Sequence, residues 1–206
     1  MIELAKGIHF STKEEVCCVP NMEGQYEAAK KEFDAASKNI VNGYVVGESD
    51  DSRFKYYFEI NIDSSKVWDL FWDIENVLFA ELDEIYCVYG LKDEEAELSD
   101  YKDKSFIKKT LEKYKFSIVN DGFLSVGIAF DKVIVEEVFI ESYKYLKVYT
   151  SQFDKIVEIL GKYDLKENPN LRFIDEFIVA SESMADEEKG IPHADTIVEE
   201  LRELLK

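Results

Sequence analysis

The stretch from Arg53 to Leu91 constrains the fold more than any other, because its hydrophobic period changes twice. Residues 54–62 alternate apolar and polar side chains, which predicts a half-buried strand. An Asp-Ser-Ser sequence at 63–65 supplies residue types that cap helices, and apolar side chains then repeat at helical spacing as far as Leu78. Residues 85–89 return to strand composition. The stretch therefore predicts a strand, a helix and a second strand at the core of an α+β domain.

Around this core, the hydrophobic pattern predicts further helices and strands, with most of the strands consecutive in the chain. Three such strands in a row are typical of an antiparallel meander. We therefore expect a mainly antiparallel sheet packed against helices on one face, with flanking N- and C-terminal helices. The predicted segments are helices at 24–39, 106–118, 151–160 and 192–205, and strands at 41–47, 123–130, 133–141, 143–149 and 171–180.

Local signals predict how three of these segments begin or end. Residues 131–132 have the length of a tight hairpin connection between two strands. Ser151 and Asp154 stand in the S-x-x-D arrangement of a capping box. The Asn-Asp-Gly sequence at 120–122 predicts the end of the preceding helix.

The length of 206 residues fits one domain with a small appendage, and 46% hydrophobic residues suffice for a packed core. We expect residues 1–180 to form a single α+β domain, and residues 181–206 to form an acidic linker and a C-terminal helix packing on it. The cysteines at 17, 18 and 87 make a poor disulfide framework, because no CxxC occurs and their number is odd. With no apolar leader and no run near the ~18 apolar residues of a membrane span, the expected location is the cytoplasm.

The charge balance is strongly acidic, with 44 acidic against 25 basic residues and a net charge of −19. Phosphate backbones and anionic membrane surfaces repel such a chain, so neither nucleic acid nor membrane is an expected partner. The charge can serve solubility alone, or it can steer a basic protein partner toward the surface. Both interpretations stay open at this point.

No motif assigns a catalytic, cofactor-binding or metal-ligating residue, and no cofactor is expected. Histidine occurs only at 9 and 193, and the phosphate-loop, GxSxG and HExxH patterns are absent. His9 lies close in sequence to Cys17 and Cys18, but an ordinary histidine beside inert thiols is the favoured interpretation. Among the carboxylates, Glu136 and Glu137 are consecutive strand residues that face opposite sides, so they cannot both line one site.

Aromatic residues offer the best candidate surface. Tyr143, Tyr145 and Tyr149 fall on one face of the predicted strand 143–149, with lysines among them. An open face of this kind suits a protein partner, whereas a covered face would make the tyrosines core with hydroxyls at the rim. Trp68 and Trp72 are one helical turn apart, a spacing that favours core over a recognition strip.

Three hypotheses for function follow. The favoured one is a non-enzymatic binding module that masks a basic partner, as bacterial immunity or antitoxin-type inhibitors do; the analogy rests on composition alone. The alternatives are a DNA-mimic acidic protein and a small enzyme with a carboxylate or metal-dependent site that the sequence hides. A deep pocket around a carboxylate of raised pKa would favour the enzyme, and an exposed acidic surface centred on aromatic residues would favour the binding module. The expected interaction surface is Tyr143, Tyr145, Tyr149 and Glu141, with the acidic connector at Asp93, Glu94 and Glu95. The partner's identity and the oligomeric state stay open.

Overall fold

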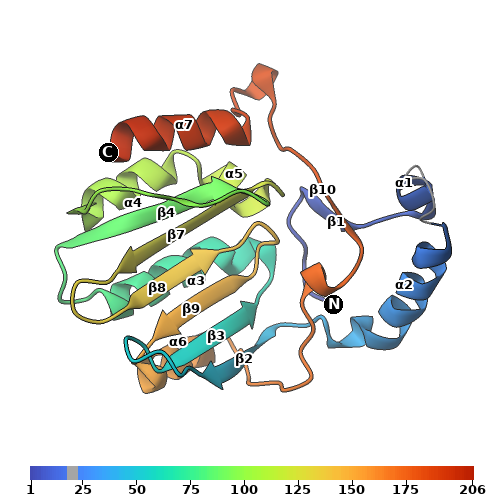
Figure 1. Ribbon diagram of the computed structural model, residues 1–206, viewed down its shortest axis with the longest axis horizontal. Coiled ribbons are helices and arrows are strands. Elements are labelled where there is room, and N and C mark those ends of the chain that lie inside the picture. The colour runs from blue at the N-terminus through green and yellow to red at the C-terminus, as the bar shows by residue number, and fades with distance from the viewer. Residues whose placement is uncertain (18–22) are drawn as a thin grey trace.

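A computed structural model describes residues 1–17 and 23–206 and centres on one large antiparallel sheet (Figure 1). The strand order is β2-β3-β9-β8-β7-β4-β5, and β6 pairs with β4 off this path. The three consecutive strands β7, β8 and β9 form the predicted meander. The strands are β2 (Gly43–Glu48), β3 (Tyr56–Asn61), β4 (Glu84–Leu91), β5 (Glu97–Leu98), β6 (Lys102–Asp103), β7 (Leu124–Phe130), β8 (Glu136–Ile140) and β9 (Leu146–Thr150).

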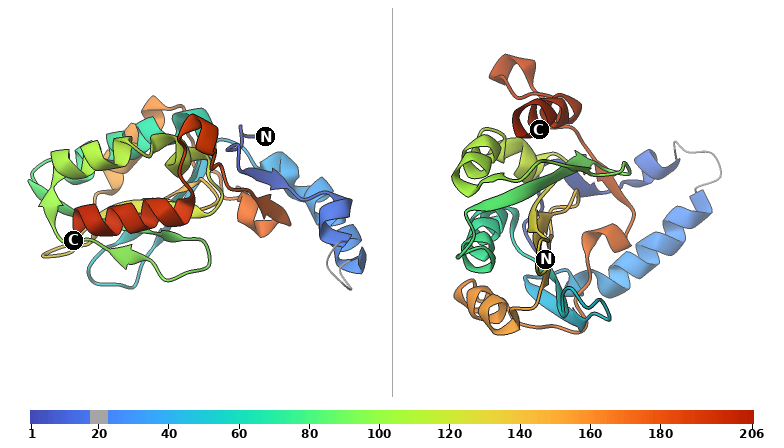
Figure 2. Two further views of the ribbon diagram at one scale, coloured as in Figure 1. Left: turned by 90° about the horizontal axis from the view of Figure 1, so that it is seen from above. Right: turned by 60° about the vertical axis from the view of Figure 1, so that its left-hand side comes forward.

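Helices cover one face of this sheet, as Figure 2 shows most clearly in its right-hand view. Alternate residues of the strands point toward this layer and join the helices in the main hydrophobic core. The predicted α+β fold, with helices packed on one face of a mainly antiparallel sheet, is confirmed. The covering helices are α3 (Ser64–Leu78), α4 (Lys104–Glu112), α5 (Lys115–Asn120), α6 (Phe153–Lys162) and α7 (Ala194–Leu205).

Helix α3 lies at the middle of this layer because its apolar stripe is wide enough to bury two tryptophans. Trp68 and Trp72 are 4% and 5% exposed, which confirms the core interpretation. The Trp68 indole N–H donates to Glu112 at 3.1 Å, and Lys108 Nζ lies 4.7 Å from the centroid of Trp72. Asp63, the N-cap, accepts from the backbone N–H of Glu3 at 2.9 Å, so the start of α3 also holds the N-terminal segment.

An N-terminal arm stands beside the sheet (Figure 1). It contains α1 (Lys13–Cys17) and α2 (Glu23–Ala36), which continues as a 3₁₀ turn to Asn39 and so matches the predicted helix. Strands β1 (Ile8–Phe10) and β10 (Val179–Ser181) pair with each other in a separate two-stranded sheet.

The predicted strand 171–180 is wrong over most of its length, because only its end is extended as β10. Residues 174–176 form a 3₁₀ helix instead. Leu171 and Phe173 pack against Tyr145, the residue just before β9, whereas Ile174 packs with Ile8 of the arm. We call residues 171–178 the strap. Its apolar side chains serve two separate clusters, a pattern that resembles strand alternation in sequence.

Other boundaries shift for local reasons. The predicted helix 106–118 divides into α4 and α5 at Tyr114, whose φ of −110° interrupts the helix, although the predicted end at Asn120 is confirmed. The two-residue hairpin at 131–132 is wrong, because β8 begins only at residue 136. The backbone N–H of Val135 donates to the backbone carbonyl of Arg53 rather than to a neighbouring strand of the hairpin.

The predicted starts of the helix at 151 and of the strand at 143, which flank β9, also differ from the structure. Gln152 is the N-cap of α6 and Thr150 accepts its backbone N–H at 2.8 Å, so the predicted capping box of Ser151 and Asp154 does not form. Strand β9 begins at residue 146 rather than 143, because Lys144 adopts a positive φ of 64° in the turn that precedes it. At the C-terminus, α7 buries its apolar side in the main core, and the proposed domain boundary at 180 stays a prediction.

Candidate functional site

The face of the sheet opposite the helix layer carries the alternate residues of the same strands, and we call it the outer face. Two rows of directly paired residues cross it, one through Glu59, Lys147 and Phe139, the other through Tyr57, Tyr149 and Glu137. Side chains opposite each other in such rows are neighbours on one face. The outer face is defined here by Tyr57, Glu59, Glu137, Phe139, Glu141, Lys147 and Tyr149.

Carboxylates dominate the charge of the outer face. Lys147 Nζ lies 3.4 Å from Glu141 Oε1 and 4.0 Å from Glu59 Oε1, so one cation serves two acids. Burial raises the pKa of Glu59, Lys147 offsets the rise in part, and Asp175 adds to it. The carboxylate of Glu59 therefore lies where water and Lys147 only partly stabilise its charge.

The adjacent acid on β8 is in a similar position. Burial raises the pKa of Glu137 as well, the guanidinium of Arg53 lowers it in part, and Asp131 raises it further. A cation brought to this face by a partner would stabilise both half-buried carboxylates, Glu59 and Glu137.

Aromatic rings lie flat on the outer face because glycines beneath them leave room. A Cβ added at Gly127 would lie 2.2 Å from the ring of Phe139, and a Cβ at Gly47 would lie 2.2 Å from the ring of Tyr57. Tyr149 meets Phe139 edge-on, with ring centroids 6.2 Å apart. The result is a surface of aromatic rings with carboxylates between them, a composition that suits the centre of a protein interface.

The structure separates the three tyrosines that the sequence grouped. Tyr149 lies on the outer face, half-buried. Tyr145 is 5% exposed beneath the strap, packs against Phe173 with centroids 4.9 Å apart, and donates its hydroxyl to Asp175 at 3.0 Å. Tyr143 precedes β9 and lies under Lys92, whose Nζ is 4.4 Å from the ring centroid. A shared open tyrosine face is therefore wrong, and Tyr145 is core with its hydroxyl at the rim.

The acidic connector is exposed between β4 and β5, where Asp93 adopts a positive φ of 65°. It follows Leu91, which pairs with Leu124 at one end of the sheet. Tyr149 pairs with Glu137 toward the other end. The structure thus brings the connector near the end of the sheet that carries Glu141 and Tyr143, and not to Tyr149. The binding role of all these residues stays a prediction.

Sequence reasoning missed a second feature, the buried Glu136. Its side chain faces the helix layer, is 0% exposed, and lines a pocket of about 270 Å³. Neither carboxylate oxygen has a hydrogen-bond partner within the described part of the chain. Burial raises the pKa of Glu136. The alternation of β8 placed Glu136 and Glu137 on opposite faces, as predicted, but no sequence signal revealed the pocket.

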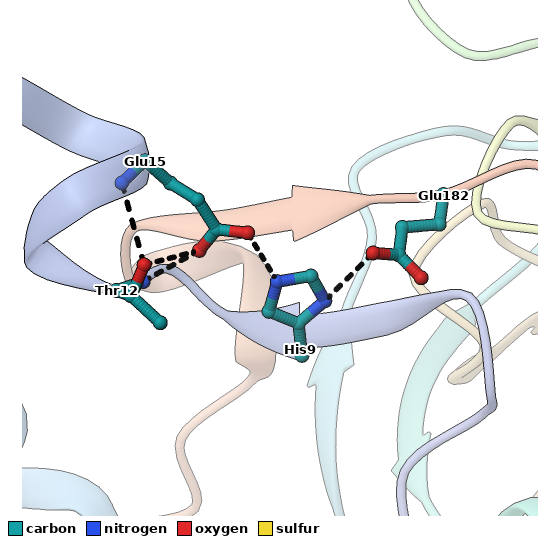
Figure 3. Close-up of polar contacts among 4 residues, drawn as sticks. All are labelled: His9, Thr12, Glu15 and Glu182. Atoms are coloured by element: carbon teal, nitrogen blue, oxygen red, sulfur yellow. Dashed lines mark hydrogen bonds and ion pairs between the residues drawn. The ribbon is translucent and has the colours of Figure 1, made fainter. Parts of the chain in front are cut away.

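His9 belongs to a polar cluster that fastens α1 to β1 (Figure 3). Glu15 accepts the backbone N–H of Thr12 at 2.7 Å, and the Thr12 hydroxyl accepts that of Glu15 at 3.3 Å, which is a capping box. The other oxygen of Glu15 is 2.9 Å from His9 Nε2, and Glu182 lies 3.9 Å from Nδ1. The Thr12 backbone N–H, followed by His9, lowers the pKa of Glu15 to about 2. The geometry supports the ordinary structural histidine.

The cysteines and a hollow in the N-terminal arm are the remaining candidates for chemistry. A pairing of His9 with Cys17 or Cys18 would involve cysteine side chains that lie outside those described. Cys87 is buried in β4, and burial raises the pKa of its thiol. A hollow of about 400 Å³ in the arm surrounds the rings of Phe10 and Phe33, whose centroids are 4.4 Å apart. Beside this hollow, the rings of Phe10 and Phe33 pack β1 against α2.

A scan against protein-family models, a search of curated proteins and a search of solved structures each found no match. None of the helices in the described part of the chain has the length and apolar character needed to cross a membrane.

Proposed function

We propose that this protein is a non-enzymatic acidic binding module that masks a basic protein partner through its outer face. The proposal places it in the cytoplasm, as an inhibitor of the immunity or antitoxin type. The observation that carries it is the excess of negative charge on the outer face, where Glu59, Glu137 and Glu141 outnumber Lys147. Burial raises the pKa of Glu59 and of Glu137, so a lysine or arginine of a partner would meet carboxylates already deprived of part of their water.

The aromatic rings support the same proposal. Tyrosine and phenylalanine supply large contact areas, and interface centres are enriched in aromatic residues. Tyr149 and Phe139 occupy the middle strands β9 and β8, with carboxylates on either side. A surface of carboxylates centred on aromatic residues supports the binding hypothesis.

The first test is a pull-down from a lysate of the native host with two immobilised baits, the wild-type protein and the triple variant E59Q/E137Q/E141Q. The wild type is expected to retain a stoichiometric basic protein that is released at high salt, because screening weakens such contacts. With the purified partner, the triple variant should associate at least roughly tenfold more slowly.

A matched variant controls for net charge. The triple variant E188Q/E199Q/E203Q removes as many charges from exposed positions on the C-terminal segment. It should bind almost as the wild type does. Equal binding by both triple variants would contradict an interface at the outer face. A partner that DNA displaces from this face would instead support the DNA-mimic alternative.

The acidic connector needs its own test. Replacing Asp93, Glu94 and Glu95 with lysine should slow association with the basic partner, because the steering field near one end of the sheet would reverse. Unchanged association would remove the connector from the interface while leaving the outer face in place.

A second candidate function is a small enzyme, and one observation favours it. Glu136 is a carboxyl group of raised pKa in a pocket, and general acid–base catalysis works best with a pKa near the working pH. A turnover assay with the E136Q variant tests this candidate once a substrate is known. The outer-face variants should leave that activity unchanged.

A further inference from the structure

The buried carboxyl group of Glu136 lines a pocket on the helix side of the sheet. The lining residues of this pocket come from the C-terminal end of α3 and the residues after it, from the β7–β8 connection and from the first turn of α6. Glu136 is fully buried there, and both of its oxygens lack hydrogen-bond partners among the described residues. Buried polar groups are ordinarily paired, so this carboxyl group is incomplete by itself.

The polar side chains at the mouth of the pocket are engaged elsewhere. Lys155 donates to Gln152 Oε1 at 2.6 Å, and Gln152 Nε2 donates to the carbonyl of Leu78 at 3.3 Å. Thr150, Gln152, the backbone N–H of Ser151 and the charge of Lys155 all lower the pKa of Glu136 in part, but burial outweighs them. None of these groups forms a hydrogen bond with either carboxylate oxygen. In this arrangement neither carboxylate oxygen is paired with a donor from the described residues.

The remaining walls are mostly apolar. Leu82, Phe130 and Ile134 line one side, and Val77 lines another. An apolar stem would bury its surface against these side chains, whereas a second charged group would have no matching partner on them.

The approach to the pocket is acidic. Glu81 lies on its rim, and an adjoining hollow shares Glu81 and Leu82 with it. That hollow adds Asp83, Glu84 and Asp103 against Lys132. A net negative approach raises the local concentration of small cations and disfavours anions.

We propose that this pocket binds a primary ammonium group on an apolar stem, with the ammonium against Glu136 and the stem against Leu82 and Phe130. An ammonium group has three donors and no acceptor, which suits two carboxylate oxygens that lack donors. A free alkylamine and a lysine side chain of a partner share this chemistry. The proposal does not depend on the outer face, and it holds whether or not the pocket supports catalysis.

The test is a chemical-shift titration of the ¹⁵N-labelled full chain near pH 7.5 with n-hexylamine and with n-hexanol. The amine should bind at least roughly tenfold more tightly than the alcohol, because only the amine pairs with the carboxylate. The E136Q variant should lose this preference. The matched variant E137Q, changed one residue along on the other face, should keep it. Equal binding of amine and alcohol, no binding of the amine, or full binding by E136Q would show a merely structural carboxyl group.

A second variant keeps the test decisive if E136Q folds poorly. Ala80 lines the pocket and is exposed, so Ala80→Trp should block it without touching Glu136 and should abolish amine binding. Nα-acetyl-lysine methylamide, added in parallel, distinguishes the two sources. Tighter binding of this probe than of hexylamine assigns the pocket to a lysine of a partner, and the reverse assigns it to a free amine. The E59Q/E137Q/E141Q variant should bind both probes normally, so failure here is separable from failure of the outer-face interface.

Discussion

Glu136 and Glu137 are neighbours in the chain but belong to different faces of the sheet. Glu136 faces the helix layer and is fully buried, and neither of its oxygens has a hydrogen-bond partner among the residues that the structure describes. Glu137 faces outward, half-buried, where Arg53 offsets part of the effect of burial on its pKa. Because consecutive strand residues point to opposite sides, one step along β8 separates a carboxylate enclosed in a pocket from one offered to a partner.

The same division runs through the neighbouring strand. On β9, residues 146, 148 and 150 are buried in the helix-covered face, while Lys147 and Tyr149 lie half-buried on the outer face. The covered face holds the molecule together, and the outer face carries charge and aromatic area that the core does not require. Substitutions on adjacent residues therefore separate stability from binding.

The largest difference is expected between Leu146→Ala and Lys147→Ala. Leu146 is 0% exposed, and its truncation should lower the free energy of unfolding by about 2–5 kcal/mol. Lys147→Ala removes two partly exposed ion pairs and should cost less than about 1 kcal/mol. Urea unfolding followed by tryptophan fluorescence measures both. Similar losses from the two variants would contradict the division between the faces.

Lys144, buried in the turn that follows β8, should produce the next largest effect, and this effect depends on pH. Burial lowers the pKa of Lys144 to about 7 from 10.5, although Asp121 and Glu141 oppose the shift. Between those values the unfolded chain binds more protons, so the free energy of unfolding should rise with pH by at most about 1.4 kcal/mol per unit from this group.

The Lys144→Met variant isolates that contribution, since other titrating groups are common to both proteins. The stability difference, wild type minus variant, should increase between pH 7 and 9 in equilibrium unfolding. A difference independent of pH would mean that Lys144 keeps an ordinary pKa.

An intermediate effect is expected from Gly127→Ala on the outer face. The new methyl group would meet the ring of Phe139, which lies 2.2 Å from the position of an added Cβ, and displacing that ring should cost about 1–3 kcal/mol. In a Phe139→Ala background the same change should cost almost nothing. A double-mutant cycle in urea measures the coupling, and additive losses would contradict the contact.

The smallest effect should come from Glu136→Gln. A raised pKa means that the native state binds more protons than the unfolded state, so the contribution of this group is lost as pH rises above its ordinary value of 4.5. E136Q should therefore gain on the wild type with rising pH, by about 1 kcal/mol at pH 8 relative to pH 4. Thermal unfolding across this range, with E137Q alongside, provides the comparison. A larger gain for E137Q would contradict the expectation that the more deeply buried Glu136 loses more on ionisation.

Local periodicity predicted much of this fold. The alternation at 54–62 and the helical spacing that follows it yielded β3 and α3, because each pattern encodes which side of an element is apolar. The same rule placed Glu136 and Glu137 on opposite faces. It also singled out Tyr149 and Glu141, which lie on the outer face, but it grouped Tyr145 with them.

What the sequence by itself determined was the class of fold, the meander and the side of the sheet that each strand residue faces, since these follow from neighbours in the chain. The tertiary structure decided the rest through contacts between distant residues. The strap buries Tyr145 through Phe173. The backbone carbonyl of Arg53 accepts the N–H of Val135, and β8 begins only at residue 136. The pocket around Glu136 arises where α3, the β7–β8 connection and α6 meet. Such meetings are set by packing across the whole molecule, and no local pattern records them.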